Sequence, residues 1–247
     1  MNKVKKAVIL AAGMGLRLQP ITNSLPKCLV EINGESLLQR TIHALEKHGF
    51  EEVIIVTGFK HEMIEKAVKE LDSPILIKTI HNEIYHSTNN IYSLWLVKDA
   101  IHEPFALLES DIIVEEDIYR SFTLPDRIAL DLYDAEIHSG TTVTLTENGM
   151  VNQMFIKQEP PNETTIFKTV NIYSFSNDTW DLLKKNMDDL IKKGDINMFY
   201  EAALKPLVSA KQIELEMVDF SNVMWDEIDS MPDYERVLNK MSIEYIT

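Results

Sequence analysis

The first strand of this chain ends in a glycine turn with a cation behind it, and this feature limits the fold more than any other. An apolar run from Ala7 to Ala12 stops at Gly13, Met14 and Gly15, and Arg17 follows. Glycine permits positive φ and lets the backbone approach a ligand without a Cβ in between. Successive N–H groups in such a turn can point at one anion. The turn therefore predicts a phosphate site at the end of a buried strand.

Two cations follow the turn and suit the same kind of ligand. Arg17 carries a planar guanidinium that matches phosphate oxygens, and Lys27 carries a compact charge on a flexible stem, so the two can share a triphosphate. A dinucleotide-binding fold would place a third glycine where Leu18 stands, and a P-loop would need a Gly-Lys-Ser/Thr triplet. Because the sequence has neither, the pattern points away from both.

Composition limits the class of protein further. With 247 residues the chain can bury one large α/β core, so residues 1–247 are predicted to form a single domain. A net charge of −15 and a pI near 4.9 argue against a nucleic-acid surface, which needs clustered Lys and Arg.

The single cysteine, Cys28, excludes an internal disulfide and fits a reducing compartment. No apolar run reaches the ~20 residues of a membrane span, so we expect a cytoplasmic protein without membrane insertion.

Strand and helix patterns alternate through the first half of the chain. Strands are expected at 4–11, 51–58, 75–80 and 104–109, and helices at 36–48, 61–71 and 88–101. This alternation predicts an α/β fold with a doubly wound, mainly parallel mixed sheet. The second half is β-rich at first, with strands expected at 128–133, 141–149, 150–156 and 169–175 and a turn at Asn148 and Gly149. Helices are expected at 177–192, 198–210 and 232–241.

Ligands of such sheets bind at the carboxyl ends of the strands. The loops after Leu10, Val56, Ile80 and Leu108 should therefore converge on one crevice. By their place on these loops, four polar residues are candidates for contacts with a base or ribose: Asn82, Thr88, Asn89 and Ser110.

Carboxylates at two distant places could hold a metal at this crevice. Asp111 follows an apolar strand and has no partner nearby in the sequence, and Glu227 and Asp229 lie two apart on one side of an extended segment. Mg²⁺ takes oxygen ligands and keeps substrate phosphates in its shell, so one carboxylate from each segment would suffice. Alternatively, Asp229 caps the final helix, where Asp and Ser are common.

The stretch from Leu10 to Gly34, LAAGMGLRLQPITNSLPKCLVEING, resembles the signature LAAGxGxRxxPxTxxxPKxxxxxxG of nucleotide-diphospho-sugar pyrophosphorylases and related nucleotidyltransferases. The resemblance implies their Rossmann-like fold with a small β-rich part that covers the acceptor. It also implies catalytic roles for Arg17 and Lys27, and Mg²⁺ bound by Asp111 and Asp229 with Glu227 as co-ligand. The nucleotide would lie against the turn residues Leu10, Ala11, Ala12, Gly13, Met14 and Gly15.

Two further stretches resemble enzymes with a particular kind of acceptor. HNEIYHSTNNIYSLWLVKDA, residues 81–100, and the closing WDEIDSMPDYERVL resemble bacterial phosphocholine cytidylyltransferases, whereas LLESDII also resembles 2-aminoethylphosphonate cytidylyltransferases. This resemblance implies that CTP is joined to a small phosphorylated amino-alcohol, phosphocholine foremost, with release of pyrophosphate. Three alternatives stay open: a 2-aminoethylphosphonate enzyme, a sugar-1-phosphate nucleotidyltransferase and a non-catalytic nucleotide-binding regulator. An NAD-binding oxidoreductase is the reading that the sequence favours least.

An aminated acceptor needs aromatic faces or acidic groups around its cation. Tyr92 and Trp95 could supply them, but their helical spacing beside Ile91 and Leu94 equally fits core packing. The preferred candidates lie near a strand end in the β-rich half: Asp131, Tyr133 and Glu136, with Asp134 beside them. Lys168 is either a solvated lysine or, as the family pattern suggests, a ligand of the acceptor's phosphate.

Overall fold

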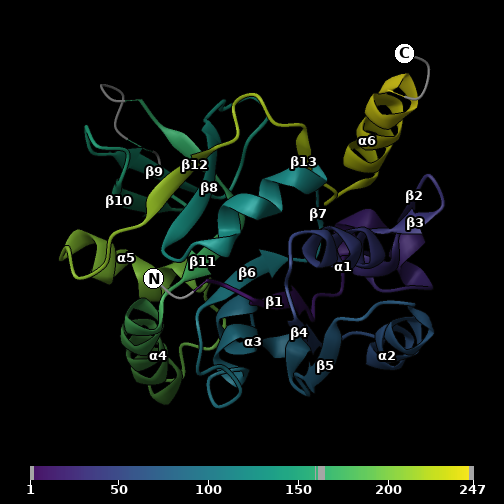
Figure 1. Ribbon diagram of the computed structural model, residues 1–247, viewed down its shortest axis with the longest axis horizontal. Helices are drawn as coiled ribbons and strands as arrows, with labels where there is room; N and C mark the ends of the chain where they lie inside the picture. The colour runs from purple at the N-terminus through teal and green to yellow at the C-terminus, as the bar shows by residue number, and fades with distance from the viewer. Residues whose placement is uncertain (1–2, 159, 161–164, 245–247) are drawn as a thin grey trace.

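The computed structural model describes residues 3–158, 160 and 165–244. Within these residues a nine-stranded mixed sheet runs in the order β10-β9-β11-β6-β1-β4-β5, with β8 paired to both β11 and β12 (Figure 1). Its parallel part consists of β1 (Lys6–Ala11), β4 (Glu52–Thr57), β5 (Leu76–His81) and β6 (Phe105–Glu109). The other strands are β8 (Arg127–Leu132), β9 (Thr141–Leu145), β10 (Val151–Ile156), β11 (Phe167–Phe175) and β12 (Glu216–Asp219).

Helices cover both faces of this sheet. On one face lie α1 (Leu37–Lys47), α2 (His61–Glu70) and the 3₁₀ segment Glu116–Thr123; on the other lie α3 (Asn90–Leu96), α4 (Asn177–Lys192) and α5 (Glu201–Ser209). Strand β1 shows why two layers form, because Ala7 and Ile9 pack into one core while Val8 and Leu10 pack into the other. A strand buried on both faces reads as a continuous apolar run. The predicted doubly wound α/β sheet is therefore confirmed.

A short ribbon joins two distant parts of the chain. Strand β7 (Ile112–Val114) pairs antiparallel with β13 (Trp225–Glu227), and Glu227 lies opposite Ile112. The pairing continues in the next residues, because the N–H of Ile228 donates to the carbonyl of Asp111 at 2.9 Å. The last helix, α6 (Met231–Glu244), and the small hairpin of β2 (Glu31–Ile32) and β3 (Glu35–Ser36) lie on the same side of the molecule (Figure 1). Because of this pairing, residues 225–228 lie beside the segment that directly follows β6.

Two predicted helices are shorter in the structure than in the sequence pattern. Helix α3 ends at Leu96 instead of residue 101. The backbone there changes to turns with i→i−3 hydrogen bonds, such as that from the Lys98 N–H to the Trp95 carbonyl at 3.2 Å. Helix α5 begins at Glu201 instead of residue 198, because the carbonyl of Met198 instead accepts from the N–H of Ile91 at 3.3 Å. Local turns therefore replace helix after Leu96, and pairing with the start of α3 replaces it before Glu201.

The turn at residues 148–149 forms as predicted. Strands β9 and β10 pair antiparallel across it, and Gly149 adopts φ 78°. None of the helices in the described ranges combines the length and apolar character that a bilayer span requires.

Candidate active site

A cavity of about 600 Å³ opens at the carboxyl ends of β1, β5 and β6, and a second of about 520 Å³ adjoins it. Both are lined by Leu10, Gly13, Arg17, Asn89, Glu109, Asp111 and Asp229. The residues that the sequence analysis assigned to the nucleotide all line one cavity or the other: Leu10, Ala11, Ala12, Gly13, Met14, Gly15, Asn82, Thr88, Asn89 and Ser110. The loops after three of the four expected strands therefore converge, and only the loop after β4 stays behind the cavity wall.

The two glycines of the turn serve different purposes. Gly15 has φ 61°, and a Cβ there would lie 3.0 Å from Cγ2 of Thr22, whose hydroxyl donates to the Gly15 carbonyl at 2.7 Å. Gly13 lacks the positive φ that the sequence analysis allowed it, and a Cβ there would meet nothing within 4 Å. The space over Gly13 is thus open to a ligand, whereas Gly15 is required by the turn itself.

A third glycine, which the sequence analysis did not single out, supports this turn from behind. Gly58 follows β4, and a Cβ there would lie 2.6 Å from the carbonyl oxygen of Ala12 and 2.7 Å from Cβ of Tyr85. Real Cβ atoms do not approach other atoms so closely, and neither neighbour is the end of a flexible side chain. Gly58 therefore allows the backbone under Ala12 to pack directly against the loop after β4.

Alanine substitutions at Gly58 and Gly13 should have different effects. The first should lower stability, and the second should weaken ligand binding. We expect Gly58→Ala to lower the free energy of unfolding by about 1–3 kcal/mol, as overpacking of an interior does, because the Ala12 backbone has to move. Gly13→Ala should unfold at the wild-type urea midpoint and bind nucleotide more weakly, since its Cβ projects into the open space. Equal midpoints for Gly58→Ala and wild type would contradict this packing argument.

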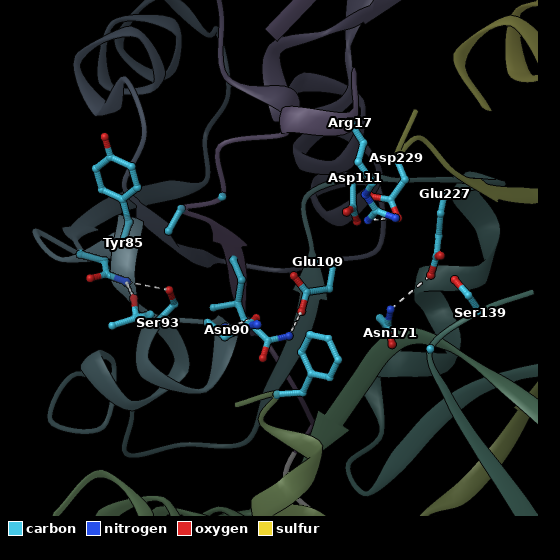
Figure 2. A pocket seen from close by; sticks show the side chains of 18 of the residues that line it. Arg17, Tyr85, Asn90, Ser93, Glu109, Asp111, Ser139, Asn171, Glu227 and Asp229 are labelled. Atoms are coloured by element: carbon cyan, nitrogen blue, oxygen red, sulfur yellow. Dashed lines mark hydrogen bonds and ion pairs between the residues drawn. The ribbon is translucent and has the colours of Figure 1, made fainter. Parts of the chain in front are cut away.

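Cations and carboxylates meet beside the turn. Nζ of Lys27 donates to Oδ2 of Asp111 at 2.7 Å and also to Oδ1 of Asp229. Nη2 of Arg17 donates to Oδ2 of Asp229 at 2.8 Å, and Figure 2 shows Arg17, Asp111 and Asp229 together. Burial opposes the charge of Lys27, but the two carboxylates outweigh burial and raise the pKa of its ammonium. The geometry thus brings together four residues that the sequence analysis named from three separate segments.

The side chain of Asp229 faces this cluster and does not cap the final helix. Helix α6 begins at Met231, and the carboxylate at its start is Asp233, which accepts from the Ser230 hydroxyl at 2.6 Å and from the Asp229 N–H at 3.3 Å. Of the two alternatives for Asp229, the contacts therefore support a place in the cluster, since its two carboxylate oxygens accept from Arg17 and Lys27.

The carboxylates of Asp111 and Asp229 can share one cation, because both already contact the same ammonium of Lys27. Glu227 lies apart from them: its Oε1 accepts from Lys168 Nζ at 3.1 Å and from Asn171 Nδ2 at 3.2 Å. Across the described ranges no three His, Cys, Asp or Glu side chains are arranged to hold a metal by themselves. A divalent metal here would thus take two protein carboxylates and draw its other ligands from a substrate.

At the β5 end of the cavity, the predicted polar residues shape the loop. Nδ2 of Asn82 donates to the hydroxyls of Thr88 at 3.0 Å and Ser93 at 3.2 Å, and its Oδ1 accepts from the Ile84 N–H at 3.2 Å. Asn89 uses its side chain to cap α3. Because Asn82 is buried and its amide is already bonded at both ends, it positions the wall of the cavity.

At the opposite end, Lys168 is only 2% exposed, so it is not a solvated lysine. Its Nζ donates to the carbonyl of Thr169 and to Glu227. Burial raises the pKa of Glu227, and the attraction of Lys168 offsets this only in part. Asn171 reaches Glu227 because β11 bulges there, with Asn171 at φ 60°. This end of the cavity therefore holds a buried cation beside a buried carboxyl group.

The other acceptor candidates lie outside the lining of both cavities. Asp131 accepts from Trp225 Nε1 at 2.8 Å, so its carboxylate anchors β13 instead of a ligand. Tyr133 lies with its ring centroid 6.3 Å from that of His138, and Glu136 is exposed. Ser139 and Gly140, from the same loop, line the cavity in their place.

The aromatic pair on α3 packs against a neighbouring helix. Nε1 of Trp95 donates to Oδ1 of Asp188 at 2.6 Å, and Lys98 Nζ lies 4.1 Å from the centroid of the Trp95 ring. The ring of Tyr92 lies against that of Trp95, with centroids 5.4 Å apart. Of the two readings that the helical spacing left open, packing is the one that the contacts support.

The sequence of residues 6–242 matches the protein family described as nucleotidyl transferase. The chain belongs to this family. Choline-phosphate cytidylyltransferase of Haemophilus influenzae is 27% identical to it over 239 residues, which is 96% of this chain and 97% of the relative. The NAD-binding alternative therefore falls away, and the protein is a nucleotidyltransferase, as its first motif predicted.

Two solved structures have the same fold as this nucleotidyltransferase. CTP:phosphocholine cytidylyltransferase from Streptococcus pneumoniae matches with a TM-score of 0.81 at 20% identity and covers 97% of this chain and 99% of its own. A UDP-glucose pyrophosphorylase complexed with UDP-glucose also has a TM-score of 0.81, at 18% identity, with 98% and 99% covered. Because enzymes with different acceptors match equally well, the fold is shown but does not select the acceptor.

The nucleotidyltransferase crevice also contains residues that the sequence analysis missed. Nδ2 of Asn90 donates to Oε1 of Glu109 at 2.9 Å, and burial, reinforced by the charges of Asp111 and Glu201, raises the pKa of Glu109 well above its usual value. Asn171, at the β11 bulge, is another polar residue of the lining that was missed. A signal existed for each, since Glu109 interrupts the apolar run FALL and Asn171 interrupts TVNIYSF.

Proposed function

We propose that this nucleotidyltransferase is a cytidylyltransferase that joins CTP to a small phosphorylated amino-alcohol, with phosphocholine as the preferred acceptor. The observation that carries the proposal is the meeting of Arg17, Lys27, Asp111 and Asp229 beside the glycine turn. End-to-end similarity to the choline-phosphate enzyme of H. influenzae supports the choice of nucleotide and acceptor.

In the proposed reaction an oxygen of the acceptor phosphate attacks the α-phosphorus of CTP in line. A new P–O bond forms at that phosphorus, the bond to the bridging oxygen of the β-phosphate breaks, and pyrophosphate leaves with the electron pair. The attacking phosphate is already anionic at neutral pH, so the step needs no general base. Catalysis of this kind is positioning plus charge stabilisation, which Arg17 and Lys27 supply around the triphosphate.

The fit of a divalent metal rests on the two carboxylates that already share the Lys27 ammonium. Asp111 and Asp229 would hold Mg²⁺, and the triphosphate would complete its shell. The ion would neutralise phosphate charge in the transition state. With both carboxylates engaged by Mg²⁺, Lys27 would be free to turn toward the phosphates.

A zwitterionic acceptor suits the far end of the cavity. Lys168 offers its ammonium to the acceptor phosphate, and the carboxyl group of Glu227 beside it offers a partner for a cationic head. Opposite charges side by side complement a molecule that carries both. The alternative use of Glu227, as a metal co-ligand, would require its contacts with Lys168 and Asn171 to open.

A matrix of pyrophosphate-release assays tests the proposal. CTP, UTP, ATP and GTP are each combined with phosphocholine, phosphoethanolamine, 2-aminoethylphosphonate and glucose 1-phosphate. The acceptors with a cationic head should exceed glucose 1-phosphate, because head and phosphate then both find a partner, and the highest kcat/KM is expected for CTP with phosphocholine, as in the choline-phosphate relatives. A response confined to glucose 1-phosphate would make the protein a sugar-1-phosphate enzyme, and nucleotide binding without release in any combination would make it a regulator.

A further inference from the structure

A carboxylate lies in the middle of the crevice, and the proposed chemistry has not used it. Glu109 is the last residue of β6 and lines both cavities. In Figure 2 it lies between two groups of residues, with Tyr85 and Ser93 on one side and the cluster of Arg17, Asp111 and Asp229 on the other. A nucleotide that reached from one group to the other would therefore lie beside Glu109.

The structure holds this carboxylate in place from one side only. Nδ2 of Asn90 donates to Oε1 of Glu109 at 2.9 Å, and Oδ1 of Asn90 accepts from the N–H of Tyr200 at 3.0 Å, so Asn90 is itself fixed at both ends. Within the described part of the chain, no donor bonds to the second oxygen, Oε2. Because Glu109 lines both cavities, this oxygen is open to a hydrogen bond with a ligand.

The position of Glu109 indicates which part of the ligand supplies that donor. The glycine turn, Arg17 and Lys27 define a phosphate end, and the wall around Asn82 and Tyr85 defines the opposite, base end. Phosphate oxygens accept hydrogen bonds and would be repelled by a carboxylate, whereas a ribose, which links base to phosphates, offers two hydroxyl donors. Acidic side chains recognise ribose hydroxyls in other nucleotide folds for the same reason.

We propose that Glu109, positioned by Asn90, accepts hydrogen bonds from the ribose hydroxyls of the bound nucleotide and makes the enzyme select ribonucleoside over 2′-deoxyribonucleoside triphosphates. This inference rests on the proposed nucleotidyl transfer at the same crevice and extends it to the sugar of the donor. It assigns Glu109 to substrate binding and Asn90 to positioning.

Titration calorimetry with CTP and dCTP in the presence of Mg²⁺ tests the inference without depending on turnover. Wild type should bind CTP about 10- to 100-fold more tightly than dCTP, as expected when dCTP leaves a partly buried acceptor without its hydrogen-bond donor. Glu109→Ala should bring the ratio close to one by weakening CTP and leaving dCTP unchanged. Asn90→Ala should lower the same ratio, and the surface variant Glu116→Ala should keep it.

Several outcomes would overturn the inference. Equal affinity of wild type for CTP and dCTP would do so, and so would a Glu109→Ala protein that keeps the ratio but binds phosphocholine more weakly, because Glu109 would then belong to the acceptor. Glu109→Gln keeps the side-chain shape, so it provides the same comparison if the alanine variant does not fold. Selection of ribose with UTP or ATP instead of CTP would refute the cytidylyl assignment and leave the role of Glu109 intact.

Discussion

Replacing Lys27 with methionine is expected to lower kcat for pyrophosphate release by about 100- to 1,000-fold, the usual cost of losing one donor to transition-state charge. Methionine keeps the length of the stem and removes the ammonium that contacts Asp111 and Asp229. The side chain of Lys27 is 12% exposed, so its charge acts in a largely dry environment where charge stabilisation is strong. Steady-state kinetics with CTP and phosphocholine measure the effect.

The matched control for Lys27→Met is Lys47→Met. Lys47 also contacts two carboxylates, Glu116 and Asp117, but it is exposed and lies on α1, away from the crevice. Its variant should turn over at the wild-type rate. Circular dichroism shows whether each variant is folded, and a folded Lys27→Met protein with wild-type kcat would remove Lys27 from the proposed mechanism.

Asp111→Asn is expected to reduce Mg²⁺-dependent turnover by about 1,000-fold. A divalent metal contributes several kcal/mol of charge stabilisation in such reactions, and each factor of ten in rate corresponds to about 1.4 kcal/mol. Asparagine preserves the shape of Asp111 but halves the number of carboxylates that face the shared cation position beside Lys27. Besides kinetics, the affinity for Mn²⁺ followed by electron paramagnetic resonance should fall in the variant.

Asp117→Asn serves as the control for the second prediction, because Asp117 is an exposed carboxylate beside Lys47 and His48 and lines neither cavity. It should bind Mn²⁺ and turn over as wild type does. If Asp111→Asn instead bound Mn²⁺ with unchanged affinity, the metal position would have to lie elsewhere in the crevice, for example at Glu227.

Local patterns were sufficient to predict which residues around the glycine turn line the crevice. Short-range geometry fixes the turn from Gly13 to Arg17 and the alternation of strands and helices. Both the sheet and the lining of the cavity near the turn could therefore be predicted from these local patterns. The meeting of Asp111 with Asp229 depends instead on the ribbon of β7 and β13. Each strand of that ribbon has three residues, too few to give a periodic signal.

The half of the crevice around Lys168 and Glu227 was harder to predict, because tertiary contacts decide what each polar side chain does. Strand alternation places Asp131 near the site, but Trp225, far along the chain, binds its carboxylate. Asn171 enters the cavity only because β11 bulges with a positive φ, which a strand pattern does not reveal. Lys168 differs from a surface lysine because it is buried. Its burial comes from β8 and β9, which pair with β11 on either side of it.

The central claim is transfer of a cytidylyl group to phosphocholine at this crevice, and ³¹P nuclear magnetic resonance tests it most directly. Protein, CTP, phosphocholine and Mg²⁺ are incubated together, and the phosphorus signals are followed with time. The account predicts that CTP and phosphocholine disappear together while the coupled diphosphate signals of CDP-choline and the signal of pyrophosphate grow in equal amounts. Conversion of CTP to CDP and phosphate with phosphocholine unchanged, or no new diphosphate signal, would contradict it.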